Sequence, residues 1–206
     1  NQLATAHMVV SNRYDQQAVT LSQGNPGTKT FSISVGQETY QVSVTIAAGD
    51  TNETVLSKVA SAINQASDGK VGASTVRDTP STAKLSVRSA STGTAGKMTF
   101  VDTRGLLGTL GQTNESPATN TVGGYVHADL GNNELDAIAT VDGLQVISST
   151  NSLDHAVDGL TINLLASQQQ GASPISLTVS TGVDSIEGQI KSFLSAYNDA
   201  FTYLAA

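Results

Sequence analysis

The side chains best suited to chemistry in this sequence are three histidines, His7, His127 and His155. Each lies in a different segment of the chain, whereas a protein zinc site gathers three or four ligands. Asp154 directly precedes His155, but adjacent residues on a regular element point apart. We therefore interpret the histidines as surface or loop residues and predict no catalytic or metal-ligating role for them.

Two further segments could hold a ligand. An oxygen-rich stretch could coordinate calcium; it comprises Asp129, Asn132, Asn133, Glu134 and Asp136. Its spacing does not match a 12-residue calcium loop with a central glycine, so a solvated turn is favoured. The glycines of Gly105–Gly111 lack the Lys-Ser/Thr ending of a phosphate loop, which favours a flexible connection.

Composition excludes several functional classes. The 206 residues contain no cysteine, so thiol catalysis, disulfides and Cys-bound metals are excluded. No G-x-S-x-G pattern marks a serine nucleophile. The net charge is −7 and Lys and Arg do not cluster, so neither nucleic acid nor an anionic membrane is an expected partner. No apolar run approaches the ~18–20 residues that cross a bilayer. We expect no enzyme, no cofactor and no metal.

Hydrophobic periodicity outlines the first half of the chain. Residues 3–21 have strand character and end at the breaker Gly24-Asn25-Pro26-Gly27. Apolar residues then alternate with polar ones on both sides of Gly36-Gln37, which predicts a β-hairpin. Asp50 and Glu53 resemble a capping box for a helix that ends near Gly69. Three short strands are predicted to follow, at 71–76, 84–89 and 97–101.

The second half is predicted to contain a connection and more strands. Residues 106–133 are rich in Gly, Thr and Asn and are expected to form a loop with one short strand at 125–130. Further strands are predicted at 138–141, 144–147, 160–166 and 175–179, with turns at Asp142-Gly143 and Asp158-Gly159.

These elements predict an α+β, mostly β fold: two small β-rich domains, one inserted in the other, followed by a C-terminal amphipathic helix. The predicted organisation is a discontinuous β-rich domain at 1–25 and 134–181, an inserted α+β module at 26–112, a linker at 113–133 and a helix at 182–206. The chain begins without signal-peptide character and is expected to be part of a longer protein.

The C-terminal helix carries an apolar stripe spaced by three and four residues, as in a helix that lies along another helix. The stripe comprises Ile186, Ile190, Phe193, Tyr197, Phe201 and Leu204. Asp184 with Glu187 resembles its N-cap and reciprocal partner. About 21 residues at ~1.5 Å each give roughly 30 Å of helix. The stripe is therefore our candidate packing interface, and docking on the chain's own sheet is the alternative.

Several segments resemble the bacterial flagellar filament-capping protein family, also called hook-associated protein 2. The segments Val141–Val146, Ser148–Asn151 and Val157–Leu164 match its C-terminal region, and Ile190–Asp199, I-K-S-F-L-S-A-Y-N-D, is the most specific match. Gln2–Ala6 resembles a further strand of the family. Segments within 30–64, from Thr30–Gly36 to Ala62-Ile63-Asn64, resemble the flagellin "IN" module.

The resemblance implies a head-domain fragment with the start of a leg helix, in a non-enzymatic assembly protein exported through the flagellar channel. Such a protein would act outside the cell at the filament tip, preventing loss of exported flagellin and promoting its folding and insertion. Implied partners are further copies of the chain in unknown number, flagellin and the hook–filament junction proteins. An extracellular adhesin module that binds host glycan or mucin is the alternative. A flagellin-like filament subunit is disfavoured, because residues 3–21 are strand-like where long helical flanks would be expected.

Overall fold

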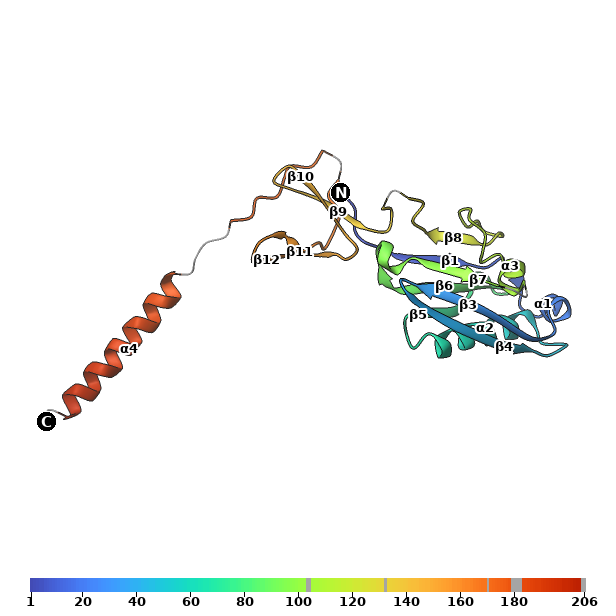
Figure 1. Cartoon of the computed structure of the whole chain (residues 1–206), viewed down its shortest axis with the longest axis horizontal. Helices are drawn as coiled ribbons and strands as arrows, with labels where there is room; N and C mark the ends of the chain where they lie inside the picture. The colour runs from blue at the N-terminus through green and yellow to red at the C-terminus, as the bar shows by residue number, and fades with distance from the viewer. Residues whose placement is uncertain (103–104, 132, 170, 179–182, 205–206) are drawn as a thin grey trace. The chain divides into compact units, whose positions relative to one another are not determined.

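The computed structural model describes residues 1–102, 105–131, 133–169, 171–178 and 183–204, with side chains of the last range from Ile186 onward. The chain divides into two compact units, 1–168 and 169–206. The first unit holds every strand of the described chain, and the second contains the C-terminal helix α4, Val183–Leu204 (Figure 1). No described helix is long and apolar enough to cross a membrane.

The largest sheet of the first unit has five strands, in the order β2-β6-β1-β8 with β5 also paired to β6. These strands are β1 (Ala6–Val10), β2 (Tyr14–Asp15), β5 (Val71–Arg77), β6 (Thr82–Thr92) and β8 (Gly124–His127). β1 therefore lies between two strands that follow it by about 80 and 120 residues. The first residues of the chain and the predicted linker thus share a sheet with the α+β module.

The second sheet contains the predicted hairpin. β3 (Gly27–Val35) and β4 (Glu38–Ile46) pair antiparallel over nine residues, and β7 (Met98–Val101) pairs with the other side of β3. The turn consists of the two residues Gly36-Gln37, and Gly36 has a φ of 59°, a conformation that glycine adopts without a Cβ penalty. The alternation in the sequence is confirmed here: Val42, Val44 and Ile46 are buried.

Helix α2 (Asn52–Ala66) supplies the helical layer of the core. Val55, Leu56, Val59 and Ile63 recur at helical spacing and are fully buried in the same cluster as the hairpin. The predicted cap at Asp50 is wrong. Thr51 is the N-cap, and its hydroxyl accepts the Thr54 N–H at 3.2 Å. The carboxylate of Asp50 lies outside the helix, where Lys58 and the Ala47 N–H donate to it.

Two short helices differ from the sequence interpretation. Residues 20–24 form α1 (Thr20–Gly24), which includes the last two residues of the segment 3–21 predicted as strand-like; the Asn52 side chain accepts the Leu21 N–H and fixes this turn against α2. The expected flexible connection at Gly105–Gly111 is wrong. It forms α3 (Leu106–Leu110), whose three leucines, Leu106, Leu107 and Leu110, have no exposed surface. Burial of apolar surface thus orders a segment whose glycines favour a loop.

Residues 137–163 form two separate hairpins. β9 (Ala137–Val141) pairs with β10 (Leu144–Ser148), and β11 (Ser152–Val157) pairs with β12 (Leu160–Asn163). The turns at Asp142-Gly143 and Asp158-Gly159 are confirmed. The sequence missed β11, in which half of the residues are polar and only Leu153 is buried, and it extended β12 too far.

The predicted strand at 175–179 is absent over its described residues. Ile175 and Leu177 alternate as in a strand, yet no described residue pairs with them, and both side chains are exposed. Residue 179 lies outside the described chain. A strand requires a neighbour as well as an alternating pattern, which explains the difference.

Side-chain hydrogen bonds join the hairpins to the main sheets within the first unit. Asp136, which is buried, accepts from both the N–H and the hydroxyl of Thr94, in the 3-10 turn Thr94–Gly96. Asn151 accepts from the Ala4 N–H and donates to the Ala4 carbonyl. The backbone of Gln2 bridges to Ile138 in β9. The predicted class, α+β and mostly β with a C-terminal helix, is confirmed; the division into domains stays a prediction.

Candidate assembly surface

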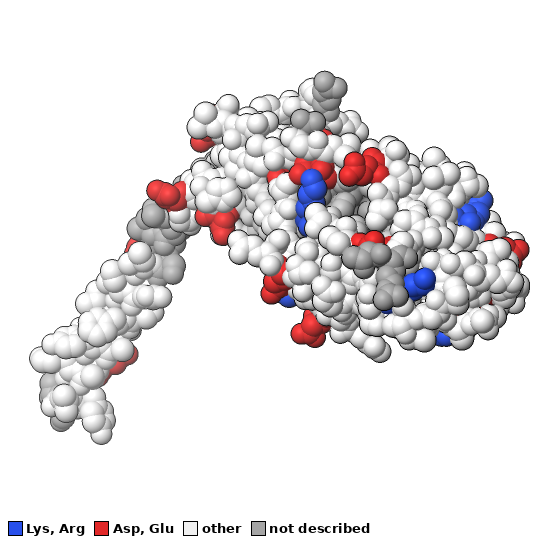
Figure 2. Space-filling model, turned by 45° about the vertical axis from the view of Figure 1, so that its right-hand side comes forward, with Lys and Arg blue, Asp and Glu red and all other residues white. Residues whose placement is uncertain are grey.

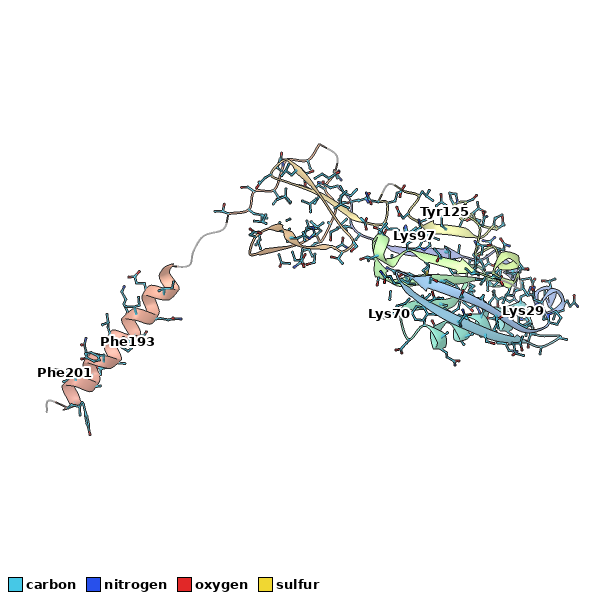
Figure 3. The ribbon with its side chains drawn as sticks, in the orientation of Figure 1. Lys29, Lys70, Lys97, Tyr125, Phe193 and Phe201 are labelled. Atoms are coloured by element: carbon cyan, nitrogen blue, oxygen red, sulfur yellow. The ribbon has the colours of Figure 1, made fainter. Side chains whose placement is uncertain are left out.

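Helix α4 presents the apolar stripe predicted from the sequence. Every described side chain from Ile186 to Leu204 is exposed, and the six stripe residues are 55–84% accessible. Figure 3 labels two of them, Phe193 and Phe201, two turns apart on the helix. A helix this apolar on one side gains free energy by burying that side against another apolar surface.

The structure adds one residue that the stripe prediction omitted. Leu194 is half-exposed and lies four residues after Ile190 and three before Tyr197, which places it beside the stripe. Leu194 itself fits the spacing of four and three residues, so the sequence could have shown it as an alternative to Phe193. A face this broad suits packing against more than one partner element.

The opposite side of α4 is polar. Glu187 and Lys191 form an ion pair at 2.6 Å with the favourable i, i+4 spacing, and both are exposed. The hydroxyls of Ser192 and Thr202 bond back to the carbonyls of Gly188 and Asn198. The view in Figure 2 shows α4 as largely uncharged, with acidic and basic side chains of the first unit scattered singly or in small groups. The predicted cap at Asp184 lies outside the described side chains.

The histidines do not form a common site. His127 and His155 are on the surface, as predicted, but His7 is buried, and that prediction is wrong. His7 lies on β1, where its Nδ1 accepts the N–H of Met98 at 2.8 Å and so connects β1 to β7. Burial, and then the charge of Lys97, lower the His7 pKa, while Asp129 opposes them. His7 is therefore held neutral, with a structural role.

A cavity of about 510 Å³ lies beside His7, and Lys97, Tyr125 and Gln112 are among the residues that line it. Figure 3 labels Lys97 and Tyr125. Lys97 donates to the backbone carbonyl of Asp129 at 2.9 Å. The Gln112 side chain donates to the Leu85 carbonyl, while its own oxygen, also buried, has no protein partner among the described residues. An ordered water is the usual partner of such an atom.

The oxygen-rich stretch binds the chain's own groups. Asp136 accepts from Thr94, and Glu134 accepts the Leu130 N–H at 2.9 Å. Residue 132 lies outside the described chain. The described residues hold no group of three or more metal-ligating side chains.

Comparison with known proteins assigns the family. A family model described as the C-terminus of flagellar hook-associated protein 2 matches residues 135–206, which include α4. The B-type flagellar hook-associated protein 2 of Pseudomonas aeruginosa is 32% identical over 179 residues, covering 82% of this chain and 35% of that protein. The chain belongs to the flagellar hook-associated protein 2 (FliD) family.

Solved FliD structures share the fold. The crystal structure of FliD from P. aeruginosa PAO1 superposes with a TM-score of 0.72 at 25% identity, covering 98% of this chain and 86% of that one. The D2-D3 domains of the Serratia marcescens flagellar cap protein FliD give 0.65 at 28% identity, covering 87% and 90%. The chain spans about a third of the length of the curated P. aeruginosa FliD.

Proposed function

We propose that this chain is part of a structural assembly protein that caps the bacterial flagellar filament. In this role it acts outside the cell at the filament tip, prevents the loss of exported flagellin and promotes its folding and insertion. The observation that carries the proposal is the exposed stripe of α4, within the segment that matches the FliD family. A helix with a long uncovered apolar side is suited to pack against other helices rather than to catalyse a reaction.

The energetics of the stripe favour a multi-subunit assembly. Full burial of an aliphatic or aromatic side chain contributes about 1.5–3 kcal/mol, so six partly exposed ones contribute roughly 6–12 kcal/mol. Association of two chains costs about 4–15 kcal/mol in lost freedom. Burial of one α4 stripe by itself therefore only about offsets this cost, and further contacts per subunit would stabilise the assembly. We propose a homo-oligomer in which α4 packs on helices of the same or neighbouring subunits.

The remaining partners follow from the same role. Flagellin subunits and the hook–filament junction proteins are the proposed contacts of the assembled cap. The absence of cysteine suits a chain that is exported unfolded, because its refolding outside the cell needs no disulfide formation.

Complementation tests the proposal with the full-length protein that contains this chain. A strain that lacks its own cap protein should release monomeric flagellin, and the full-length protein should restore filaments. Phe193→Asp should abolish this rescue, because it places a charge in the stripe. Ser195→Asp, with the same new charge on the polar side, is the matched control and should still rescue. Failure of the unaltered protein, together with binding to mucin glycans, would favour the adhesin function.

A further inference from the structure

Strand β4 is a long edge strand without the usual protection. It pairs with β3 through nine consecutive residues with no shift in register. On its other side, no strand among the described residues pairs with it. Natural proteins protect such edges with proline, lysine or a bulge, because an open edge binds further strands. The strand sequence, ETYQVSVTI, contains neither proline nor lysine, and its pairing with β3 contains no bulge.

The register defines which backbone groups are open. The two-residue turn makes Val35 and Glu38 the first hydrogen-bonded pair, and bonded and non-bonded pairs then alternate along the hairpin. The N–H and C=O groups of the non-bonded residues point away from β3. These residues are Thr39, Gln41, Ser43 and Thr45, and no described residue bonds to their backbone on the open side.

A groove runs beside the second half of this edge. It has a volume of about 580 Å³ and lies between β4 and the outer side of α2. The β4 side contributes Ser43, Val44 and Thr45, and the α2 side is formed mostly by short side chains, including Thr54, Ser57, Ser61 and Ala62. An open strand edge facing a helix leaves room for one extended chain, the arrangement in which domains bind peptides by strand addition.

The charges of the groove are already paired. Glu53 binds Arg77, and Lys58 binds Asp50 at 2.5 Å. An occupant therefore meets hydroxyl groups, a small apolar surface and open backbone groups, but no unpaired charge from these residues. A charged segment would lose hydration there without gaining an ion pair. The groove thus suits an uncharged, extended segment with small aliphatic and hydroxyl side chains.

We propose that the groove between β4 and α2 binds an extended, uncharged polypeptide segment, which adds to β4 as a fourth strand of its sheet. The inference deepens the proposed function, because in a filament cap the bound segment would belong to an exported subunit that has not yet folded. Only this identification of the segment rests on the proposed function. Backbone hydrogen bonds provide the binding, so the site accepts many sequences with short side chains.

Peptide binding tests the inference directly on the full chain. The probe is a fluorescein-labelled heptapeptide, Ser-Val-Thr-Val-Ser-Val-Thr, with blocked ends, and the readout is fluorescence anisotropy. Two further probes carry N-methyl groups on the odd or on the even residues. In an added strand only alternate N–H groups face β4. We expect the parent peptide and one methylated peptide to bind, and the other methylated peptide to lose at least tenfold in affinity.

Variants of the chain locate the site. Ser43→Pro removes an N–H that points away from β3, so the hairpin should persist while peptide affinity falls at least tenfold. Ser61→Glu narrows the groove from the α2 side and should also lower peptide affinity at least tenfold. This second variant keeps the test valid if Ser43→Pro does not fold. Glu187→Gln on α4 is the control and should leave affinity unchanged.

Three outcomes would overturn the inference: no binding at millimolar peptide, equal binding of all three peptides, or unchanged affinity in folded Ser43→Pro and Ser61→Glu variants. A dimer of the chain in sedimentation that Ser43→Pro abolishes, with no peptide bound, would also overturn it. Failure in these assays leaves rescue by the full-length protein unaffected. Failure of the rescue with intact peptide binding would instead refute the cap function.

Discussion

Replacement of Asp136 should weaken the connection between the two hairpins of residues 137–163 and the main sheets. Its carboxylate is 4% exposed and accepts two hydrogen bonds from Thr94, one from the backbone N–H at 2.7 Å and one from the hydroxyl. Hydrogen bonds to a charged group contribute about 1.5–3 kcal/mol each, so Asp136→Ala should lower the free energy of unfolding by roughly 3–6 kcal/mol. At about 2–4 °C per kcal/mol for a protein of this size, Tm should fall by at least about 6 °C.

Calorimetry of the full chain measures this effect. Asp136→Asn retains an acceptor for the Thr94 N–H and should lose roughly half as much stability. A double-mutant cycle with Thr94→Val isolates the hydroxyl bond, because the two changes should be strongly non-additive. A Tm of Asp136→Ala within about 2 °C of the parent, less than the shift expected from 1 kcal/mol, would refute the reasoning. It would mean that contacts other than the Asp136–Thr94 hydrogen bonds hold the hairpins in place.

Four further substitutions test the core, the helix start and the buried histidine. Leu107→Ala should cost about 2–5 kcal/mol in chemical denaturation, because α3 is part of the core; a loss under roughly 0.5 kcal/mol would restore the loop interpretation. Thr51→Ala should cost about 1 kcal/mol, whereas Asp50→Ala should not remove the helix cap. The lowered pKa of His7 means that the unfolded chain binds more protons, so stability should fall as the pH drops below 6.5. In His7→Gln this decline should be smaller, and identical pH profiles for the two proteins would contradict a lowered pKa of His7.

The sequence predicted best those elements whose pattern is local. The hairpin of β3 and β4 alternates strictly around a two-residue turn, and the buried side of α2 repeats at helical spacing. The stripe of α4 has the same local origin, because positions three and four apart share one side of a helix. Its role as an interface stays a prediction.

Elements that depend on distant partners were predicted poorly. The turn at Thr20–Gly24 is fixed by Asn52, and α3 forms because its leucines enter a core built by strands from elsewhere in the chain. His7 carries no sequence signal of burial, since a single polar residue on a strand does not reveal what lies opposite it. The open edge of β4 likewise emerges only once the partners of every described strand are known.

The sequence by itself determined the class of the fold, the periodic elements and the apolar side of the last helix, because each depends on residues within a few positions of one another. The tertiary structure alone decided that β1 pairs with both β6 and β8, that Asp136 accepts hydrogen bonds from Thr94 and that residues 175–178 pair with no described strand. The first two features connect residues that are tens of positions apart. The third depends on whether another described strand lies beside the segment. Periodicity along the chain carries no information about which distant segment supplies the partner.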